Sequence, residues 1–516
     1  MGLSTATASS EGIEICIFDL RRGQQEGQEL DKILFFFPAD CPFTLQLSVI
    51  GLSEGLITFT RIFSPDAACD VIDAERHSHI FYQAEPDIWM VMVVEKNKEL
   101  EHKYLTAALQ AFLKEVHSLF VMFHGSIRAL LEKQPGGELA RSHLYSFIMD
   151  YLTDFLVGKK LQLPSFRDCL KERSTVQMLT VGREMAIEIQ SLVRVIESSC
   201  AGTSGCHSVV LFQDLLVSTT LPSDDTANLF TYAVLRMTPH ALSSSTNSWS
   251  YLHKGSTTSH ASTGPIFPNA ELASEDYRHT SRDTSPGGQV QRHHLPRPLQ
   301  RNKWSKAKDG FLVTDIWSGE IGSLVSASPT VWMKQIEERM VFCVYQYKNL
   351  TIIILLPVSS LVNQEQGITL MKQQFLENAS QKIFRIEEKL SKGWGGENTY
   401  HISGYRYLLY DSHRCVSRAS PPGKVATLAK DSLRALSKLR GEVDIEKSRA
   451  KRDDTSHEKD LEVCIRANNN SWVIARITRG KELYMVLEKA RETLLYASEA
   501  MERFSDRYCN GAFSLD

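Results

Sequence analysis

The sequence lacks the local signatures of the common enzyme classes. It contains no Walker A loop, no dinucleotide-binding GxGxxG after a strand and no HExxH motif. Cys200, Cys206 and His207 lie in a Gly/Ser/Thr-rich stretch without a second pair of metal ligands. Asp168 and Cys169 have no neighbour in sequence that would activate a nucleophile. We therefore expect no covalent catalysis, no bound metal and no cofactor.

Long apolar runs and an excess of charge of one sign are also absent. The longest apolar runs, 88–94, 119–123 and 352–358, are far shorter than the roughly 20 residues that span a bilayer, which predicts no transmembrane helix. Lys plus Arg number 58 against 61 for Asp plus Glu, so the net charge of -3 creates no field that attracts nucleic acid or anionic lipid. We expect no nucleic-acid partner, and membrane contact only through a local patch or another protein.

The cysteines indicate a reducing compartment. The ten cysteines form no tight framework, and Cys16, Cys343 and Cys464 lie in apolar runs where a free thiol packs as a small hydrophobic group. Residues 1–6 lack both the pattern of a signal peptide and the Ser or Thr at position six that myristoylation requires. The expected location is the cytoplasm.

Two segments lack the apolar pattern of a folded core. Residues 243–308 are rich in Ser, Thr, Pro, Gly and His, and carry nine Lys/Arg against four Asp/Glu, which predicts a disordered, mildly basic insertion. Residues 441–460 are polar and mixed in charge, which predicts a long loop. The rest of the 516-residue chain is long enough for about three domains.

A repeated pattern supports three domains. A β-hairpin followed by a long amphipathic helix is predicted at 79–133, at 341–390 and at 461–504, where Leu483 to Phe504 form one helical stripe. A further strand is predicted before each hairpin, at 13–20, 209–217 and 405–410. Antiparallel hairpins with helices against the sheets give an α+β fold, so we expect three similar domains in tandem, each of about 110 to 150 ordered residues.

The most informative segment for function is the predicted helix over 45–63, which ends before Ser64 and Pro65. Helical spacing gives two apolar stripes. The first is expected to pack on the sheet of its own domain and consists of Val49, Leu52, Leu56, Phe59 and Phe63. The second is expected to face outward as a docking surface and consists of Ile50, Glu54, Ile57 and Arg61. The alternative is a helix buried between two layers.

The remaining candidates are weaker. The histidine pairs His77/His79 and His117/His124 are better explained as features of a sheet surface and of a packed helix than as metal ligands. One basic cluster is a candidate for contact with an anionic membrane, and a solvated tail explains it equally well; it consists of Arg297, Arg301, Lys303, Lys306 and Lys308.

Several long strings resemble a known family. GQQEGQELDKILFFFP at 23–38, IGLSEGLITFTRIFSP at 50–65, DIWMVMVVE at 87–95 and FHGS at 123–126 are similar to the Ccz subunit of the Mon-Ccz complex, above all its plant form. The likeness is densest over 13–185 and continues more loosely to the C-terminus. It covers nothing in 243–308.

The resemblance implies three tandem longin-type domains, each an antiparallel sheet with helices on both faces. The implied boundaries are 10–165 for the first domain, 166–205 for a helical linker, 206–392 for the second domain with the insertion 243–308, and 398–510 for the third. In that family the first longin domain pairs with a Mon-type longin subunit, and the joint surface receives a late-endosomal or vacuolar Rab GTPase. Ile50, Glu54, Ile57 and Arg61 would then lie on the helix that belongs to this surface.

The implied function is that of a subunit of a heterodimeric guanine-nucleotide exchange factor. Such a subunit is cytoplasmic and is recruited peripherally to the late endosome, the prevacuolar compartment and the vacuole, with contact to anionic or phosphoinositide-bearing membrane. A longin scaffold or tether without exchange activity is the alternative. A metal-dependent hydrolase built on the histidines is disfavoured by the missing motifs.

Overall fold

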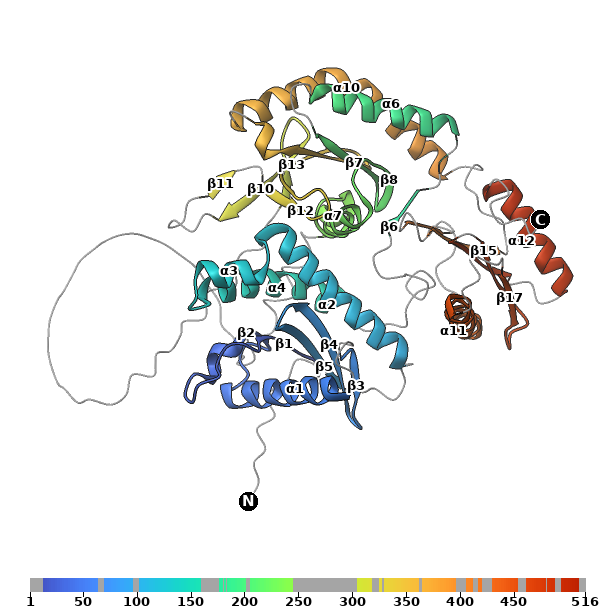
Figure 1. Ribbon diagram of the computed structural model, residues 1–516. Coiled ribbons are helices and arrows are strands. Elements are labelled where there is room, and N and C mark those ends of the chain that lie inside the picture. The colour runs from blue at the N-terminus through green and yellow to red at the C-terminus, as the bar shows by residue number, and fades with distance from the viewer. Residues whose placement is uncertain are drawn as a thin grey trace, which may run out of the picture.

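A computed structural model shows three β-sheets that follow one another along the chain, each with helices on its faces (Figure 1). This confirms the α+β class and the predicted order of hairpins and helices. The structure describes residues 13–63, 69–95, 102–158, 176–179, 181, 183–200, 205–244, 304–317, 324–326, 329–361, 364–395, 405–411, 416–419, 429–452, 461–478, 480–487 and 493–509.

The first unit is a five-stranded antiparallel sheet of order β2-β1-β5-β4-β3. β5 lies at its centre because seven of its eight residues are apolar, so both of its faces can be covered. The strands are β1 (Ile13–Asp19), β2 (Ile33–Phe37), β3 (Val71–Asp73), β4 (His77–Glu85) and β5 (Ile88–Glu95).

Helices cover both faces of this sheet. One face packs against α1 through a cluster that contains Trp89 and Val91 of β5, and the opposite face packs against α2, α3 and α4. The helices are η1 (Glu29–Lys32), α1 (Phe43–Phe63), α2 (His102–His124), α3 (Ile127–Lys133) and α4 (Glu138–Gly158). The predicted end of α1 at residue 63 is confirmed.

The single long helix predicted after the first hairpin, within 79–133, is two helices, α2 and α3. Gly125 breaks it with a φ of +83°, a left-handed conformation that suits glycine, and Ser126 caps α3 by accepting a hydrogen bond from the Ala129 amide. The Glu85 carboxylate accepts hydrogen bonds from the first backbone amides of α3, at 2.7 Å and 2.8 Å. The chain therefore turns sharply enough for α4 to return beside α2.

The second unit is an eight-stranded sheet with the main order β11-β10-β13-β14-β7-β8. One face packs on α6 and α10, and the other faces α7 and the first unit. The predicted strand over 209–217 is a hairpin, because Gln213 takes a positive φ in a tight turn. The strands are β7 (His207–Phe212), β8 (Leu215–Thr219), β9 (Trp304–Lys306), β10 (Phe311–Trp317), β11 (Leu324–Ser326), β12 (Thr330–Met333), β13 (Glu338–Tyr347) and β14 (Leu350–Pro357).

The helices of this unit change two expectations. α6 lies inside the predicted linker 166–205 but packs beside α10 on the second sheet. β9 and the end of α8 lie inside the predicted insertion 243–308, so its edges are ordered, and residues 245–303 lie outside the described part. The helices are α6 (Arg183–Ser199), α7 (Ser223–Arg236), α8 (Pro239–Ser244), η2 (Val358–Ser360) and α10 (Gln364–Gly395).

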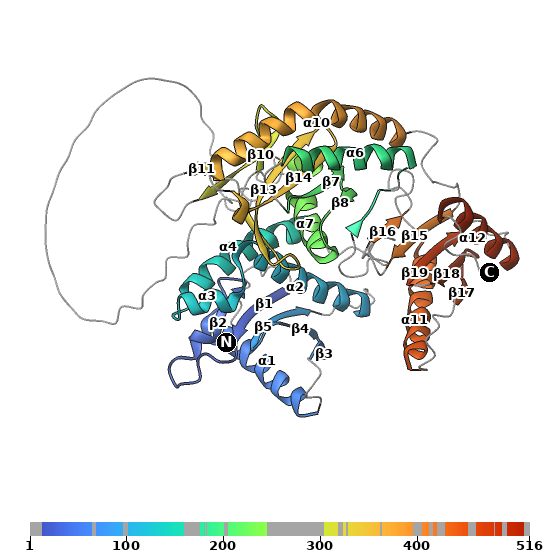
Figure 2. The same cartoon turned by 45° about the horizontal axis from the view of Figure 1, so that its top comes forward.

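The third unit is a six-stranded sheet of order β17-β18-β19-β15-β16-β6, with α11 on one face and α12 on the other (Figure 2). Its elements are β6 (Val176–Gln177), β15 (Tyr405–Asp411), β16 (Val416–Ala419), β17 (Leu461–Arg466), β18 (Trp472–Thr478), β19 (Lys481–Leu487), α11 (Lys430–Arg452) and α12 (Leu494–Cys509).

Two predictions fail in the third unit. The stripe from Leu483 to Phe504 is not one helix, because Leu483, Val486 and Leu487 lie in β19 and only the later residues lie in α12. The loop predicted at 441–460 is helical up to Arg452, because α11 needs only one apolar side against its sheet and can be polar elsewhere.

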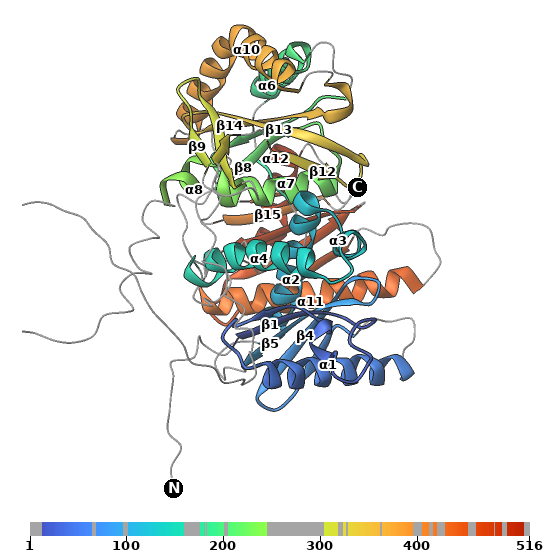
Figure 3. The same cartoon turned by 90° about the vertical axis from the view of Figure 1, so that its left-hand side faces the viewer.

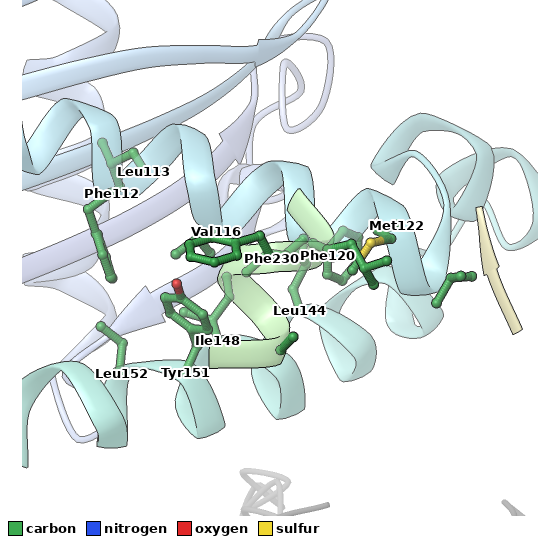
Figure 4. Packing of buried hydrophobic residues seen from close by; sticks show 14 of the residues in the cluster. Phe112, Leu113, Val116, Phe120, Met122, Leu144, Ile148, Tyr151, Leu152 and Phe230 are labelled. Atoms are coloured by element: carbon green, nitrogen blue, oxygen red, sulfur yellow. The ribbon is translucent and has the colours of Figure 1, made fainter. Parts of the chain in front are cut away.

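The first and second units share a core. Phe112, Val116 and Phe120 of α2 pack with residues of α4 and with Phe230 of α7 in one buried cluster (Figure 4). An ion pair of 2.8 Å joins Arg236 of α7 to Asp150 of α4. These contacts place the second unit against the face of the first unit that α2 and α4 cover. α1 lies on the opposite face of the first sheet.

A short strand links the second and third sheets. Val176 and Gln177 pair in parallel with β16, and the Met178 amide donates to the Ser417 carbonyl oxygen at 2.8 Å. The next amide, that of Leu179, donates to the Leu216 carbonyl oxygen in the second sheet at 2.7 Å. The domain boundaries proposed from the sequence stay predictions.

Candidate functional site

α1 packs on the first sheet through a side that mixes apolar and polar residues. Its buried residues are Gln46, Ile50, Ser53 and Ile57, which follow helical spacing. Ile50 and Ile57 are each 1% exposed and lie in the same cluster as Trp89. Ser53 is fully buried, and its small side chain lets the helix lie close to the strands.

The outward orientation predicted for Ile50 and Ile57 is therefore wrong. The buried side is hard to recognise because it contains two polar residues that find partners locally. Ser53 Oγ donates to the Val49 carbonyl oxygen at 2.8 Å, and Gln46 Nε2 donates to the Cys41 carbonyl oxygen at 2.7 Å. Satisfied in this way, polar groups can be buried without the usual cost, and the two isoleucines supply the apolar contact.

Glu54 and Arg61, the charged members of the predicted face, lie at the borders of α1. Lys32 Nζ lies 2.7 Å from the Glu54 carboxylate, which ties α1 to η1. The exposed Arg61 guanidinium lies over the ring of the buried Trp89, 5.5 Å from the ring centre. Both side chains remain reachable from solvent, but neither lies at the centre of an exposed apolar face.

The apolar residues predicted to pack on the sheet instead form the exposed side of α1. Leu52 is 54% exposed, Phe59 58% and Phe63 71%, and the Phe59 and Phe63 rings touch edge to face. Val49 and Leu56 are half-buried at the border. We call this exposed side the α1 outer face; it consists of Leu45, Leu52, Phe59, Ile62 and Phe63.

The α1 outer face is a contiguous apolar surface at one end of the molecule. Leu45, Leu52 and Phe59 recur every seven residues and so lie on nearly one line along the helix. In the described part of the chain no other element covers this side of α1, and α6 and α10 of the second unit lie at the opposite end (Figure 3). Contiguous exposed apolar surface of this kind is typical of sites that contact another protein or a membrane.

Two glycines add a second property to the same helix. A Cβ atom at Gly51 or Gly55 would meet nothing within 4 Å, so packing inside this chain does not require glycine there. Each costs the helix about 0.5–1 kcal/mol relative to alanine. Their effect is to leave the helix backbone open to close approach along the side that borders Leu52 and Phe59.

By length and composition, α1 is the one helix among the described residues that is apolar enough to cross a membrane, against the prediction made from uninterrupted runs. A long helix with one side on a sheet and an apolar opposite side also meets this test. Ile50 and Ile57 are held in the core between α1 and the first sheet. We therefore attribute the apolar composition of α1 to its buried side together with the α1 outer face.

The chemical candidates do not converge on a reactive centre. Among the residues that the structure describes, no group of three His, Cys, Asp or Glu side chains could hold a metal ion. His117 is hydrogen-bonded to Tyr82 and Glu85, and His124 Nδ1 lies 2.9 Å from His143 Nδ1. Burial, and secondarily the neighbouring His143, lowers the pKa of His124 to about 4, so this imidazole is neutral near pH 7.

The predicted basic cluster is only partly described. Lys306 ends β9 and Lys308 lies in the turn before β10, and both are exposed. Arg297, Arg301 and Lys303 lie outside the described residues, so membrane contact at this cluster stays a prediction.

Comparison with known proteins identifies the family of the chain. Residues 13–125 match the first longin domain of INTU, CCZ1 and HPS4. Over their full lengths, the chain is 62% identical to the vacuolar fusion protein CCZ1 homolog of Oryza sativa subsp. japonica and 62% identical to CCZ1 homolog B of Arabidopsis thaliana. It is 23% identical to the CCZ1 homolog of Nematostella vectensis over 98% of each chain. The chain therefore belongs to the CCZ1 homologs of the vacuolar fusion proteins, and its first unit is a longin domain.

Proposed function

We propose that this chain is one subunit of a heterodimeric guanine-nucleotide exchange factor. Together with a Mon-type longin subunit it activates a late-endosomal or vacuolar Rab GTPase, and so promotes endosome maturation and fusion with the vacuole. Membership of the CCZ1 homologs supports the role in vacuolar fusion. The observation that carries the proposal is the α1 outer face on the first longin domain.

The α1 outer face fits a platform for protein partners. Its leucines and phenylalanines supply apolar area, and aromatic residues at the centre of an interface often carry most of its binding energy. Glu54 and Arg61 lie beside the buried side of α1, nearly opposite Leu52, where they supply charges that can select among partners without being deeply buried. Gly51 and Gly55 let a partner approach the backbone.

Exchange activity needs no reacting side chain in this chain. A platform that binds the nucleotide-free GTPase more tightly than the nucleotide-bound form must weaken nucleotide binding by the same factor. It acts by holding a switch segment of the GTPase in a position that disturbs its magnesium and phosphate site. Equal affinity for both forms would release nothing.

The second and third units would then be further longin-type domains that support the heterodimer. Each has a sheet with helices on both faces, and the second unit shares a core with the first. In this arrangement the α1 outer face is displayed on a rigid base. The complex is recruited from the cytoplasm to the late-endosomal, prevacuolar or vacuolar membrane, where Lys306 and Lys308 contact anionic or phosphoinositide-bearing lipid.

The test is release of a fluorescent GDP analogue from a late-endosomal Rab, measured for the complex and for each subunit alone. We expect stimulation by the complex, and a loss of at least tenfold when Leu52→Glu is introduced into the α1 outer face. Ile187→Glu is the matched control, because Ile187 is comparably exposed, at 60%, but lies on α6. A stable complex that stimulates no release would refute the exchange proposal.

A scaffold or tether is the second candidate, because an exposed apolar face together with the exposed Lys306 and Lys308 can also recruit other proteins to a membrane without exchange activity. It predicts that deleting 245–303 and neutralising both lysines abolishes binding to anionic vesicles while GDP release in solution is absent throughout. The exchange proposal predicts instead that the same variant retains its release activity in solution.

A further inference from the structure

Two cysteine thiols meet where α6 ends and β7 begins. The Sγ atoms of Cys200 and Cys206 are 2.9 Å apart. Cys200 is 4% exposed and belongs to the buried cluster between α6 and the second sheet, and Cys206 is half-buried at its edge. This pair lies in the second unit at the end of α6, a helix on the side of the molecule away from α1 (Figure 3).

The two sulfur atoms lie close to bonding distance, and the backbone beside each is defined. Cys200 follows the last turn of α6, where its amide donates to the carbonyl oxygens of Ile196 and Glu197. Gly205 takes a left-handed φ of +87°, which reverses the chain just before Cys206. A disulfide has an S–S length of about 2.05 Å, so a bond requires the sulfurs to approach by less than about 1 Å.

The surroundings determine how fast such a bond would form. The contact with Cys200 and then burial raise the pKa of Cys206 well above its ordinary value. Thiolates, not thiols, attack disulfides and peroxides, so Cys206 reacts slowly at neutral pH. It is therefore unsuited to rapid peroxide sensing but can equilibrate with a disulfide pool over longer times.

We propose that Cys200 and Cys206 form a reversible disulfide and constitute a redox modification site. The oxidant is a small-molecule disulfide such as glutathione disulfide. The Cys206 sulfur, after losing its proton, attacks one glutathione sulfur and releases one glutathione. The Cys200 sulfur then loses its proton, attacks the Cys206 sulfur and expels the second glutathione. Two thiols are thus oxidised as one disulfide is reduced, and the end of α6 becomes tied to β7.

The test uses the full chain equilibrated with mixtures of reduced and oxidised glutathione at pH 8, followed by alkylation under denaturing conditions. Trypsin releases residues 195–236 as one peptide that contains both cysteines and no other. As the oxidised share rises, this peptide should change from two alkyl groups to none, with the loss of two hydrogens. Cys16, buried in the first unit, is the control and should stay alkylated.

Single substitutions separate the two steps. Cys200→Ser should leave Cys206 able to hold one glutathione as a stable mixed disulfide, whereas Cys206→Ser should leave the buried Cys200 unmodified. Retention of both alkyl groups at every glutathione ratio would overturn the proposal. A glutathione adduct on the unsubstituted chain that never resolves to the disulfide would overturn it as well. These outcomes are independent of exchange activity, so failure here leaves the proposed function untouched.

Discussion

The orientation of α1 makes a sharp prediction for two residues that are two positions apart. Ile57 is 1% exposed against the first sheet, and Phe59 is 58% exposed on the α1 outer face. Replacing a buried isoleucine by alanine costs about 2–5 kcal/mol, because apolar contact is lost and a cavity remains. Phe59 touches the Phe63 ring, which is also exposed, and replacing a surface side chain of this kind changes stability by about 0.5 kcal/mol or less. Ile57→Ala should therefore destabilise the first unit, and Phe59→Ala should not.

Hydrogen exchange read by mass spectrometry resolves this difference without requiring that the whole chain unfold in one step. The peptide that covers β5 reports on the core beneath α1, because Trp89 and Val91 pack there with Ile57. If Ile57→Ala lowers the free energy of opening of β5 by about 3 kcal/mol, the amide hydrogens of that strand should exchange at least a hundredfold faster. Protection should stay within about threefold of the parent chain for Phe59→Ala.

GDP release by the heterodimer gives the complementary result. Phe59→Ala should slow it by about tenfold or more if this ring is a central contact, which corresponds to roughly 1.4 kcal/mol of binding energy. Ile187→Ala on α6 is the control for loss of an exposed side chain. If Phe59→Ala instead exposed β5 and Ile57→Ala left it protected, α1 would face the sheet with its other stripe and the reasoning would be refuted.

Three other perturbations have expected outcomes that the described contacts set. Gly55→Ala should raise the free energy of unfolding by about 0.5–1 kcal/mol, because the added methyl group meets nothing within the chain. It should nevertheless slow GDP release, because the methyl group keeps a partner from approaching the helix backbone. Faster release would contradict that close approach. Glu85→Ala should weaken the start of α3 by about 1–2 kcal/mol, seen as faster amide exchange at Ile127, and unchanged exchange would show that the carboxylate cap is dispensable. The pKa of His124, lowered to about 4 from 6.5, means that the unfolded chain binds more protons between these values, so stability is lost as pH falls through that window. Urea denaturation should show a loss of about 2 kcal/mol between pH 7.5 and 5 that His124→Phe removes.

Much of the framework can be predicted from the sequence because it depends on local pattern. A strand covered on both faces is expected at β5, since an apolar residue stands at every position of 88–94. The hairpins at β4–β5, β13–β14 and β17–β18 follow from apolar runs separated by short polar turns. The strings that resemble the Ccz family are equally local, and the full-length CCZ1 relatives confirm the family that they indicate.

Helix boundaries are harder to predict where different patterns overlap. Leu483, Val486 and Leu487 fit a helical stripe and also fit a strand, and pairing with β15 and β18 decides for the strand. The second half of α11 has the composition of a loop, and it continues the helix because Val443 packs on the sheet in line with Leu436 and Leu439 of the first half.

The sequence by itself determined that α1 is a helix with two apolar sides, but only the tertiary structure decided which side faces the sheet. Periodicity fixes the angles between side chains on one helix, not the rotation of that helix about its axis. The rotation depends on how closely the helix can lie on the strands, and the small Ser53 together with the internally bonded Gln46 makes the mixed side the better fit. The larger Leu52, Phe59 and Phe63 therefore remain outside, where they form the face that a partner can bind.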